Sequence, residues 1–331
     1  MKISALCIMC LFVLGLRAQP AGYSYGKQIT IPASQVSGST DFTNFPILVE
    51  VIHNDFRTVA NGGRMQNSNG YDVVFTTSDC STVLDHQIEE YTGSNGEIIF
   101  WVKIPTLNAT KSTLIHMYYG NSIINSDPST DNVWDANFTG VYHLSNNDLT
   151  DAAGSNDCTN SSTSNRGNAK IDGGRTYNNI NDYIECPVTG MSMTTVTVTL
   201  WGRADAFPTG HQYFYGHTAT NGSWASRIQL YTNENTGLLD LGLGDSHGRD
   251  NNFYNLNTGQ YYFIALTWDD GDYEVYINNN LETSGTYTGL TTLNTSNEHD
   301  IGNDGRGSAR NEGFDGRLDE YQFSNVARSG D

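Results

Sequence analysis

The end of the chain decides the fold: residues 297–302 read NEHDIG and Gly313–Arg328 read GFDGRLDEYQFSNVAR. In the second stretch apolar and polar side chains alternate, which predicts a β-strand with one face on a core. The alternation puts Asp319 on the same face as Tyr321 and Phe323, two residues expected in that core. A carboxylate in such a place needs a hydrogen-bond partner, an opposite charge or a metal ion.

The first eighteen residues predict a secretory signal peptide. Lys2 supplies a positive start, the apolar stretch Ile3–Leu16 follows, and the small residue Ala18 ends the segment. The apolar stretch is shorter than the roughly 20 residues that a membrane helix needs, and no later stretch approaches that length. We therefore expect an exported protein without membrane insertion, secreted or held at the cell surface, beginning at Gln19.

The exported chain is strongly acidic. Without Lys2 and Arg17 the 17 basic residues fall to 15 against 36 acidic ones, which gives a net charge of −21. Nucleic-acid binding depends on Lys and Arg side chains that neutralise phosphates, so this composition argues against a nucleic acid as partner. The surplus carboxylates suit a solvated surface and are also the oxygen ligands that Ca²⁺ prefers.

Three cysteines remain after export: Cys80, Cys158 and Cys186. An oxidising compartment permits disulfides. A bond between Cys158 and Cys186 would close a loop of 29 residues, which contributes roughly 3 to 4 kcal/mol in the chain-entropy model. Cys80 would then be a buried thiol or the partner in an intermolecular bond. One sequence does not fix this connectivity.

Length and texture predict two all-β domains. The exported chain exceeds one average domain, Gly and Asn are abundant, and short alternating runs bounded by Gly, Asn, Asp and Ser recur without a sustained helical period. The first block spans residues 19–122 and the second 133–331. The polar stretch 123–132, which contains Asp127-Pro128-Ser129, is interpreted as the linker.

The strands of both blocks can be placed. In the first block we expect them at residues 27–31, 46–52, 72–76, 97–104 and 112–119. The last of these carries bulky side chains on both faces and should lie in the middle of its sheet. In the second block Val196, Val198 and Leu200 share one face of a strand at 195–201, and Asp269–Asp272 is the expected hairpin connection.

The second block resembles the laminin-G-like domains of the concanavalin A-like lectin and glucanase superfamily. Besides the two closing stretches, the resemblance rests on an ordered succession of weaker motifs: Val141–Leu144, Asp151, Ile180–Ile184, Thr195–Trp201, Thr258–Trp268 and Asp272–Asn278. It implies an antiparallel jelly-roll β-sandwich. On an exported chain it implies recognition of sugars or surfaces, by analogy of fold.

The first block resembles an uncharacterised bacterial β-rich domain that commonly precedes laminin-G-like domains in large surface proteins. The residues that carry this resemblance are Leu84–Tyr91 (LDHQIEEY), Ile99–Pro105 (IFWVKIP) and Met117–Asn121 (MYYGN). This family has no assigned activity. The resemblance therefore predicts only the architecture of the first block, a smaller β-sandwich domain. Because relatives usually continue past the closing strand, we also expect further domains of a longer surface protein.

The laminin-G-like resemblance also implies a structural Ca²⁺ ion. Asp319 is the leading candidate ligand. It could instead pair with His143, or act as a hydrogen-bonded side chain that locks the two terminal strands together. Asp151 and Asp182 are further candidate ligands on the strength of acidity and loop position.

The stretch 211–217 (HQYFYGH) predicts an aromatic platform. In one regular strand its odd-numbered residues share a face, and the two terminal imidazoles, about 20 Å apart, cannot bind one metal ion. Aromatic rings on this face and on nearby strands could stack on the apolar face of a sugar; the alternative is that they pack the interior. The predicted ligand-binding residues are Tyr213, Tyr215, Trp224 and Tyr231.

No catalytic signature of this superfamily is present. Its glycanases carry Glu-x-Asp-x-x-Glu on one strand, so that alternate carboxylates enter one cleft, and this spacing does not occur in the chain. The adjacent acids Glu89–Glu90 and Asp319–Glu320 would point to opposite faces of their strands. A phosphate loop and a His-Glu-x-x-His motif are also absent.

We therefore predict an exported recognition module that binds a glycan or glycoprotein without catalysis, through rim loops or the aromatic face. Two alternatives stay open. A polysaccharide hydrolase would need two carboxylates from separate strands, about 5 to 10 Å apart in one cleft. A structural spacer in a surface adhesin would lack an aromatic or polar pocket.

Overall fold

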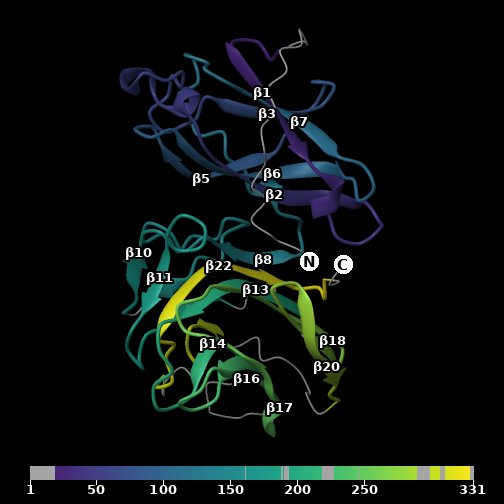
Figure 1. Cartoon of the computed structure of the whole chain (residues 1–331), viewed down its shortest axis with the longest axis vertical. Helices are drawn as coiled ribbons and strands as arrows, with labels where there is room; N and C mark the ends of the chain where they lie inside the picture. Colours follow the sequence, from purple (N-terminus) through teal and green to yellow (C-terminus); the bar gives the residue numbers. More distant parts are fainter. Residues whose placement is uncertain are drawn as a thin grey trace. The chain divides into compact units, whose positions relative to one another are not determined.

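The chain forms two compact units, one ending at Asp135 and the other beginning at Ala136 (Figure 1). The computed structural model describes residues 19–160, 162–187, 189, 194–217, 227–244, 246–288, 299–305 and 310–328. Within them the helical elements are four short 3-10 turns, Ala33–Gln35, Asn54–Phe56, Val59–Asn61 and Asp131–Val133. No helix in this part of the chain is long and apolar enough to cross a membrane. The predicted all-β class is confirmed.

The first unit is a small sandwich of two antiparallel sheets. One has the order β1-β7-β3-β4 and the other β2-β6-β5. Side chains from both sheets fill one core, in which the rings of Phe75 and Phe100 lie 5.6 Å apart. The strands are β1 (Tyr25–Ile31), β2 (Phe42–Ile52), β3 (Val73–Thr77), β4 (Val83–Leu84), β5 (His86–Thr92), β6 (Glu97–Leu107) and β7 (Thr113–Tyr119).

Strand β7 has the central place that its sequence predicts. It pairs with β1 on one side and with β3 on the other. Its residues Ile115, Met117 and Tyr119 belong to the core, because alternate side chains of a strand point to one face.

The stretch predicted as the linker is tied to the first unit. The backbone N–H of Thr130 donates to the carbonyl of His86 at 3.1 Å, and the ammonium of Lys103 donates to the carbonyl of Asn132 at 2.7 Å. The indole N–H of Trp134 reaches the side chain of Gln87 at 3.1 Å. These bonds explain why the first unit ends at Asp135.

The second unit consists of two larger antiparallel sheets, drawn as two layers in Figure 1. The eight-stranded sheet has the order β10-β11-β22-β13-β18-β19-β20, with β8 paired to β22 beside β11. The seven-stranded sheet has the order β17-β16-β15-β14-β21-β12-β9. The first eight strands are β8 (Phe138–Tyr142), β9 (Thr159–Asn160), β10 (Ser164–Arg166), β11 (Gly174–Tyr177), β12 (Ile184–Cys186), β13 (Thr195–Ala204), β14 (Gln212–His217) and β15 (Ile228–Thr232). The others are β16 (Leu238–Leu243), β17 (Ser246–Asn255), β18 (Tyr262–Asp269), β19 (Asp272–Ile277), β20 (Asn280–Thr286), β21 (His299–Ile301) and β22 (Gly316–Ser324).

The closing stretch of the sequence forms β22, which pairs with the opening strand β8 of the same unit and with β13. Tyr321 and Phe323 lie in the core together with Val196, Val198 and Leu200 of β13. The expected hairpin joins β18 to β19: Asp269 pairs with Asp272, and the two residues between them have positive φ angles. The predicted jelly-roll sandwich is therefore confirmed.

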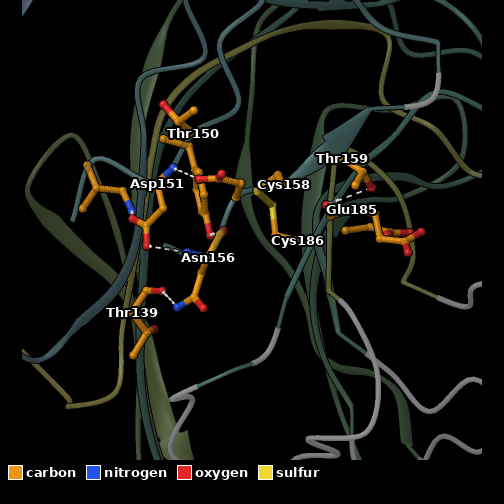
Figure 2. Close-up of a disulfide and its surroundings, with 12 residues drawn as sticks. Thr139, Thr150, Asp151, Asn156, Cys158, Thr159, Glu185 and Cys186 are labelled. Atoms are coloured by element: carbon orange, nitrogen blue, oxygen red, sulfur yellow. Dashed lines mark hydrogen bonds between the residues drawn. A yellow bond between two sulfur atoms is a disulfide. The ribbon is translucent and has the colours of Figure 1, made fainter. Parts of the chain in front are cut away.

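A disulfide joins Cys158 to Cys186, as the sequence allowed (Figure 2). It lies where the edge strand β9 pairs with β12, and both sulfur atoms are in the core of the second unit. Cys80 is a free thiol in the first unit, 3.1 Å from the hydroxyl of Tyr118.

Candidate functional site

The outer face of the seven-stranded sheet carries a row of aromatic and acidic side chains. Antiparallel pairing puts Tyr213 of β14 opposite Tyr231 of β15, and Tyr231 opposite Asp240 of β16. The two tyrosine rings stack with their centroids 4.8 Å apart and their planes at 28°, and His211 stands edge-on to Tyr231 at 5.0 Å. This row faces away from the core, whose residues on the same strands include Leu230 and Leu241.

Buried polar groups lie beside the tyrosine pair. Arg227 donates to the carbonyl of Gly244 at 2.7 Å and to the side chain of Gln229 at 3.1 Å. Gln229 in turn donates to the carbonyl of Asp304 at 2.7 Å. Arg227, Gln229 and Asp304 all have no exposed surface. A charged and hydrogen-bonding cluster buried on a sheet's outer face marks this surface as specialised, because burial of polar groups is costly.

The hydroxyl of Tyr213 is a buried polar group beside this cluster. Among the residues that the structure describes, it has no hydrogen-bond partner. Burial raises the pKa of Tyr213 well above its usual value, and the negative charges of Glu312 and Asp304 raise it further, while Arg227 acts in the opposite direction. The phenol therefore stays protonated and can both donate and accept a hydrogen bond.

A close backbone crossing encloses the site. The segment 303–305, which follows β21, runs directly over β14 at Gly216. A Cβ atom at position 216 would lie 2.2 Å from the carbonyl oxygen of Asn303, so only glycine fits there. The side chain of Asn303, the first residue of this segment, donates to the carbonyl of Asp182 at 2.8 Å and ties the segment to the chain before β12.

An ion-pair network continues the face toward β12. Asp300 of β21 lies opposite Glu185 of β12, and Arg310 binds both carboxylates. It donates to the two oxygens of Asp300 at 2.7 and 2.9 Å, and its guanidinium lies 3.7 Å from the ring centre of Tyr183. Burial raises the pKa of Asp300 to about 6, although the hydrogen bonds from Arg310 lower it.

Residues 172–331 match the family model described as the concanavalin A-like lectin/glucanases superfamily. The second unit carries a concanavalin A-like domain. Residues 69–151 match a domain of unknown function, DUF2341, in the position before it that the sequence predicts. Both predicted resemblances are thereby confirmed. A search of the curated proteins gave no match.

Solved structures of similar fold include domain 4 of AbnA, a GH43 extracellular arabinanase from Geobacillus stearothermophilus, in complex with arabinotriose. It is 23% identical with a TM-score of 0.45, and the match covers 60% of this chain and 96% of that domain. A sialidase from Trypanosoma rangeli matches at 11% identity and a TM-score of 0.48, over 74% of this chain and 42% of its own. Botulinum neurotoxin type C, whose cell entry depends on two ganglioside molecules, matches at 11% and 0.41, over 59% of this chain and 49% of its own. The chain thus spans less than half of the sialidase and toxin chains.

A bulge in β14 divides the predicted aromatic platform of the concanavalin A-like domain. The pairing with β15 shifts between Tyr213 and Tyr215, so Phe214 and Tyr215 both point inward. The ring of Tyr215 lies 6.3 Å from that of Phe323, in the opposite sheet. The expectation that Tyr215 shares a face with Tyr213 is therefore wrong. Trp224, the fourth predicted ligand-binding residue, lies outside the described residues.

A second bulge corrects the prediction for Asp319. The pairing of β22 with β13 shifts at Glu320, which has a φ angle of 50°, and this puts Asp319 and Tyr321 on opposite faces. One oxygen of Asp319 accepts the N–H groups of Lys170 and Ile171, each at 2.8 Å, which ties that loop to β22. His143 pairs with Glu320 at 2.9 Å, so the proposed pair with Asp319 is wrong.

The other predicted metal ligands organise loops. Asp151 accepts the N–H groups of Val141, Ala153 and Asn156. Figure 2 shows Asp151 and Asn156 beside the disulfide. Asp182 accepts the N–H groups of Asn178 and Asn179 and the hydroxyl of Ser162.

These donor sets do not fit a calcium ion. Ca²⁺ needs six to eight oxygens directed at one point, whereas Asp151, Asp182 and one oxygen of Asp319 accept backbone N–H groups in three separate loops. The second oxygen of Asp319 has no hydrogen-bond partner among the described residues. Calcium binding therefore stays a prediction from the sequence and takes no part in the chemistry described for the concanavalin A-like domain.

Glu185 and Asp300 are a pair of carboxylates from separate strands, the arrangement that a hydrolase would need. Arg310 lies between them, however, and donates to both. Hydrogen bonds from a guanidinium favour the ionised form of a carboxylate, although burial leaves the pKa of Asp300 raised to about 6.

The sequence did not reveal most of the polar cluster. Arg227, Gln229, Asp304 and Arg310 come from separate loops and strands, and none belongs to a spaced motif. The only local signal was the stretch NEHDIG, which marks β21 and contains Asp300.

Proposed function

We propose that the concanavalin A-like domain is an extracellular recognition module that binds carbohydrate on the outer face of its seven-stranded sheet. The observation that carries the proposal is the stacked pair Tyr213–Tyr231 beside the hydrogen-bonding groups of Arg227, Gln229 and Asp304. A sugar offers an apolar face of C–H bonds and an edge of hydroxyl groups. Aromatic rings next to a few placed polar groups meet both. Because Tyr213 and Tyr231 have no exposed surface, the proposal requires the chain that covers them to move aside when a sugar binds.

Three further observations support the proposal. The domain belongs to a superfamily of lectins and glucanases. The Cys158–Cys186 bond suits an oxidising, extracellular compartment. The Arg310-bridged carboxylates favour binding over hydrolysis, so we assign a non-catalytic role with a glycan or glycoprotein as partner.

We expect residues 19–331 to bind a subset of glycans on an array and Tyr231→Ala to weaken that binding about tenfold or more, because buried aromatic anchors dominate recognition energy. Tyr276→Ala is the matched control, since Tyr276 lies on β19 of the other sheet, where its hydroxyl donates to Glu274 two residues away. Thermal melts of each variant would establish folding. The proposal would be rejected if no glycan on the array bound, or if folded Tyr231→Ala bound glycans as tightly as the wild type.

The predicted calcium ion is tested in the same assay. Binding and melting temperature would be measured in Ca²⁺ and again with chelator. Loss of both with chelator would establish the ion, whereas unchanged values would remove it and leave the sugar site intact.

A further inference from the structure

Strand β21 carries a histidine into the core of the concanavalin A-like domain. In its pairing with β14, Ile301 lies opposite Tyr215 and Asp300 lies opposite Gly216. The next step of this antiparallel register puts His299 opposite His217, and both histidines have at most 1% of their surface exposed. Asp300 points to the outer face and His299 to the inner one, since side chains alternate along a strand.

The surroundings of His299 are aromatic. Its ring stacks on Phe323 at 5.2 Å and on Tyr321 at 5.9 Å, and Tyr215 lies 5.9 Å away. Within the described part of the chain neither of its ring nitrogens has a hydrogen-bond partner.

The titratable groups around His299 come from each packed element. β14 contributes Tyr215 and His217, β22 contributes Tyr321, and β12 contributes Cys186, which is held in the disulfide. The charge interaction that acts on the imidazole comes from His217 and opposes protonation. Burial together with this interaction lowers the pKa of His299 to about 3. A proton on His299 would thus be an unpaired charge in the core.

We propose that the His217–His299 pair makes β21 an acid-sensitive element, which opens in mildly acidic solution and dismantles the site on the outer face. The link to ligand release rests on the proposed function. Structurally, β21 holds Asp300 for Arg310, and it leads directly into the segment that crosses Gly216. Opening β21 therefore removes both the ion pair and the carbonyl of Asp304 that accepts from Gln229.

The direction of the effect follows from linkage. An imidazole in the open form takes up a proton near pH 6.5, while His299 in the closed form resists it down to about pH 3. The open form therefore gains population as pH falls below 6.5. Asp300 acts in the opposite direction, because its folded pKa of about 6 lies above its ordinary value of 3.8 and favours the closed form as pH falls. Variants at position 299 remove the contribution of His299 to the pH dependence of opening and leave that of Asp300, so comparing them with the wild type separates the two.

Hydrogen exchange of the amides of 299–305 in the full chain tests the device without a ligand. After correction for intrinsic exchange, the titration of His299 is expected to increase the opening of these amides about 25-fold between pH 7 and pH 5, before the opposing effect of Asp300. The variant His299→Phe keeps an aromatic ring in the stack but has no imidazole to titrate. Its increase in amide opening from pH 7 to pH 5 should therefore be smaller than that of the wild type by the factor that His299 contributes. His299→Leu serves if the phenylalanine does not fit.

The control is His116→Gln in the first unit, which should respond to pH like the wild type. Equal pH responses of the wild type and of folded His299 variants would overturn the proposal. A second arm measures glycan affinity at the two pH values, and the wild type should lose more affinity than His299→Phe. If no glycan on the array binds, the proposed function is rejected, but the hydrogen-exchange test of β21 remains valid. Faster exchange with unchanged affinity would reject the link to the site.

Discussion

Arg310→Ala is expected to lower the free energy of unfolding of the concanavalin A-like domain by about 3 to 5 kcal/mol, which is the usual effect of removing one partner from a buried ion pair. Asp300 has no exposed surface, and Arg310 supplies two of its hydrogen bonds. Without the guanidinium, an ionised carboxylate stays buried, and among the described residues the N–H of Gly305 is the donor that remains to it. Denaturant unfolding monitored by tryptophan fluorescence measures the loss.

The control for this prediction is Arg203→Ala. Arg203 lies 3.2 Å from Asp205, but both side chains keep about a quarter to a third of their surface exposed. A pair in that setting contributes at most about 1 kcal/mol. A loss of similar size in both variants would contradict the argument from burial.

The loss in Arg310→Ala should also depend on pH. A carboxyl whose folded pKa is raised above the unfolded value of 3.8 contributes stability at low pH and loses it as pH rises through the folded pKa. Asp300 takes up a proton more readily when Arg310 is gone, so the deficit should shrink near pH 4. The double variant Arg310→Met with Asp300→Asn should recover part of the stability at pH 7.

Removing the disulfide should have an effect of similar size. Replacing Cys158 and Cys186 by serine is expected to lower the free energy of unfolding by about 3 to 4 kcal/mol, because the bond restricts the unfolded chain. It also fixes β9 against β12 at the sheet edge. Calorimetric melts of the oxidised wild type and the double variant measure the difference. Cys80→Ser, which removes a free thiol in the other unit, should change stability by less than about 1 kcal/mol.

The sequence predicted those parts of the fold that short-range patterns determine. Alternation placed β7 and β13 with their correct faces, and the two-residue connection at Asp270–Gly271 marked a hairpin. The closing stretch was identified as the strand that completes the sandwich, and β22 pairs with β8 as expected. The disulfide was one of the pairings that three cysteines allow.

The errors have a common cause. A bulge inserts one residue into a strand, so the side-chain alternation before the bulge no longer matches the alternation after it. The bulges at Phe214 and Glu320 therefore moved Tyr215 inward and Asp319 outward. Neither position carries a glycine or another residue that would have signalled a break in alternation.

The buried polar cluster was beyond local reasoning for a different reason. Its groups are distant in the sequence, and only the sheet order β16-β15-β14-β21-β12 brings Asp240, Tyr231, Tyr213 and Asp300 onto one face. Charged residues such as Arg310 are exposed on average, so their burial could not be predicted without the pairing of strands.

The pairing of β22 with β8 has a mechanical consequence. Because the two strands are antiparallel neighbours, Phe138 at the start of β8 lies next to Ser324 at the end of β22. A tensile load applied through both ends of this domain would act on that contact first, peeling hydrogen bonds one after another instead of shearing them together. The domain should therefore yield at a low force when it is stretched from its two ends.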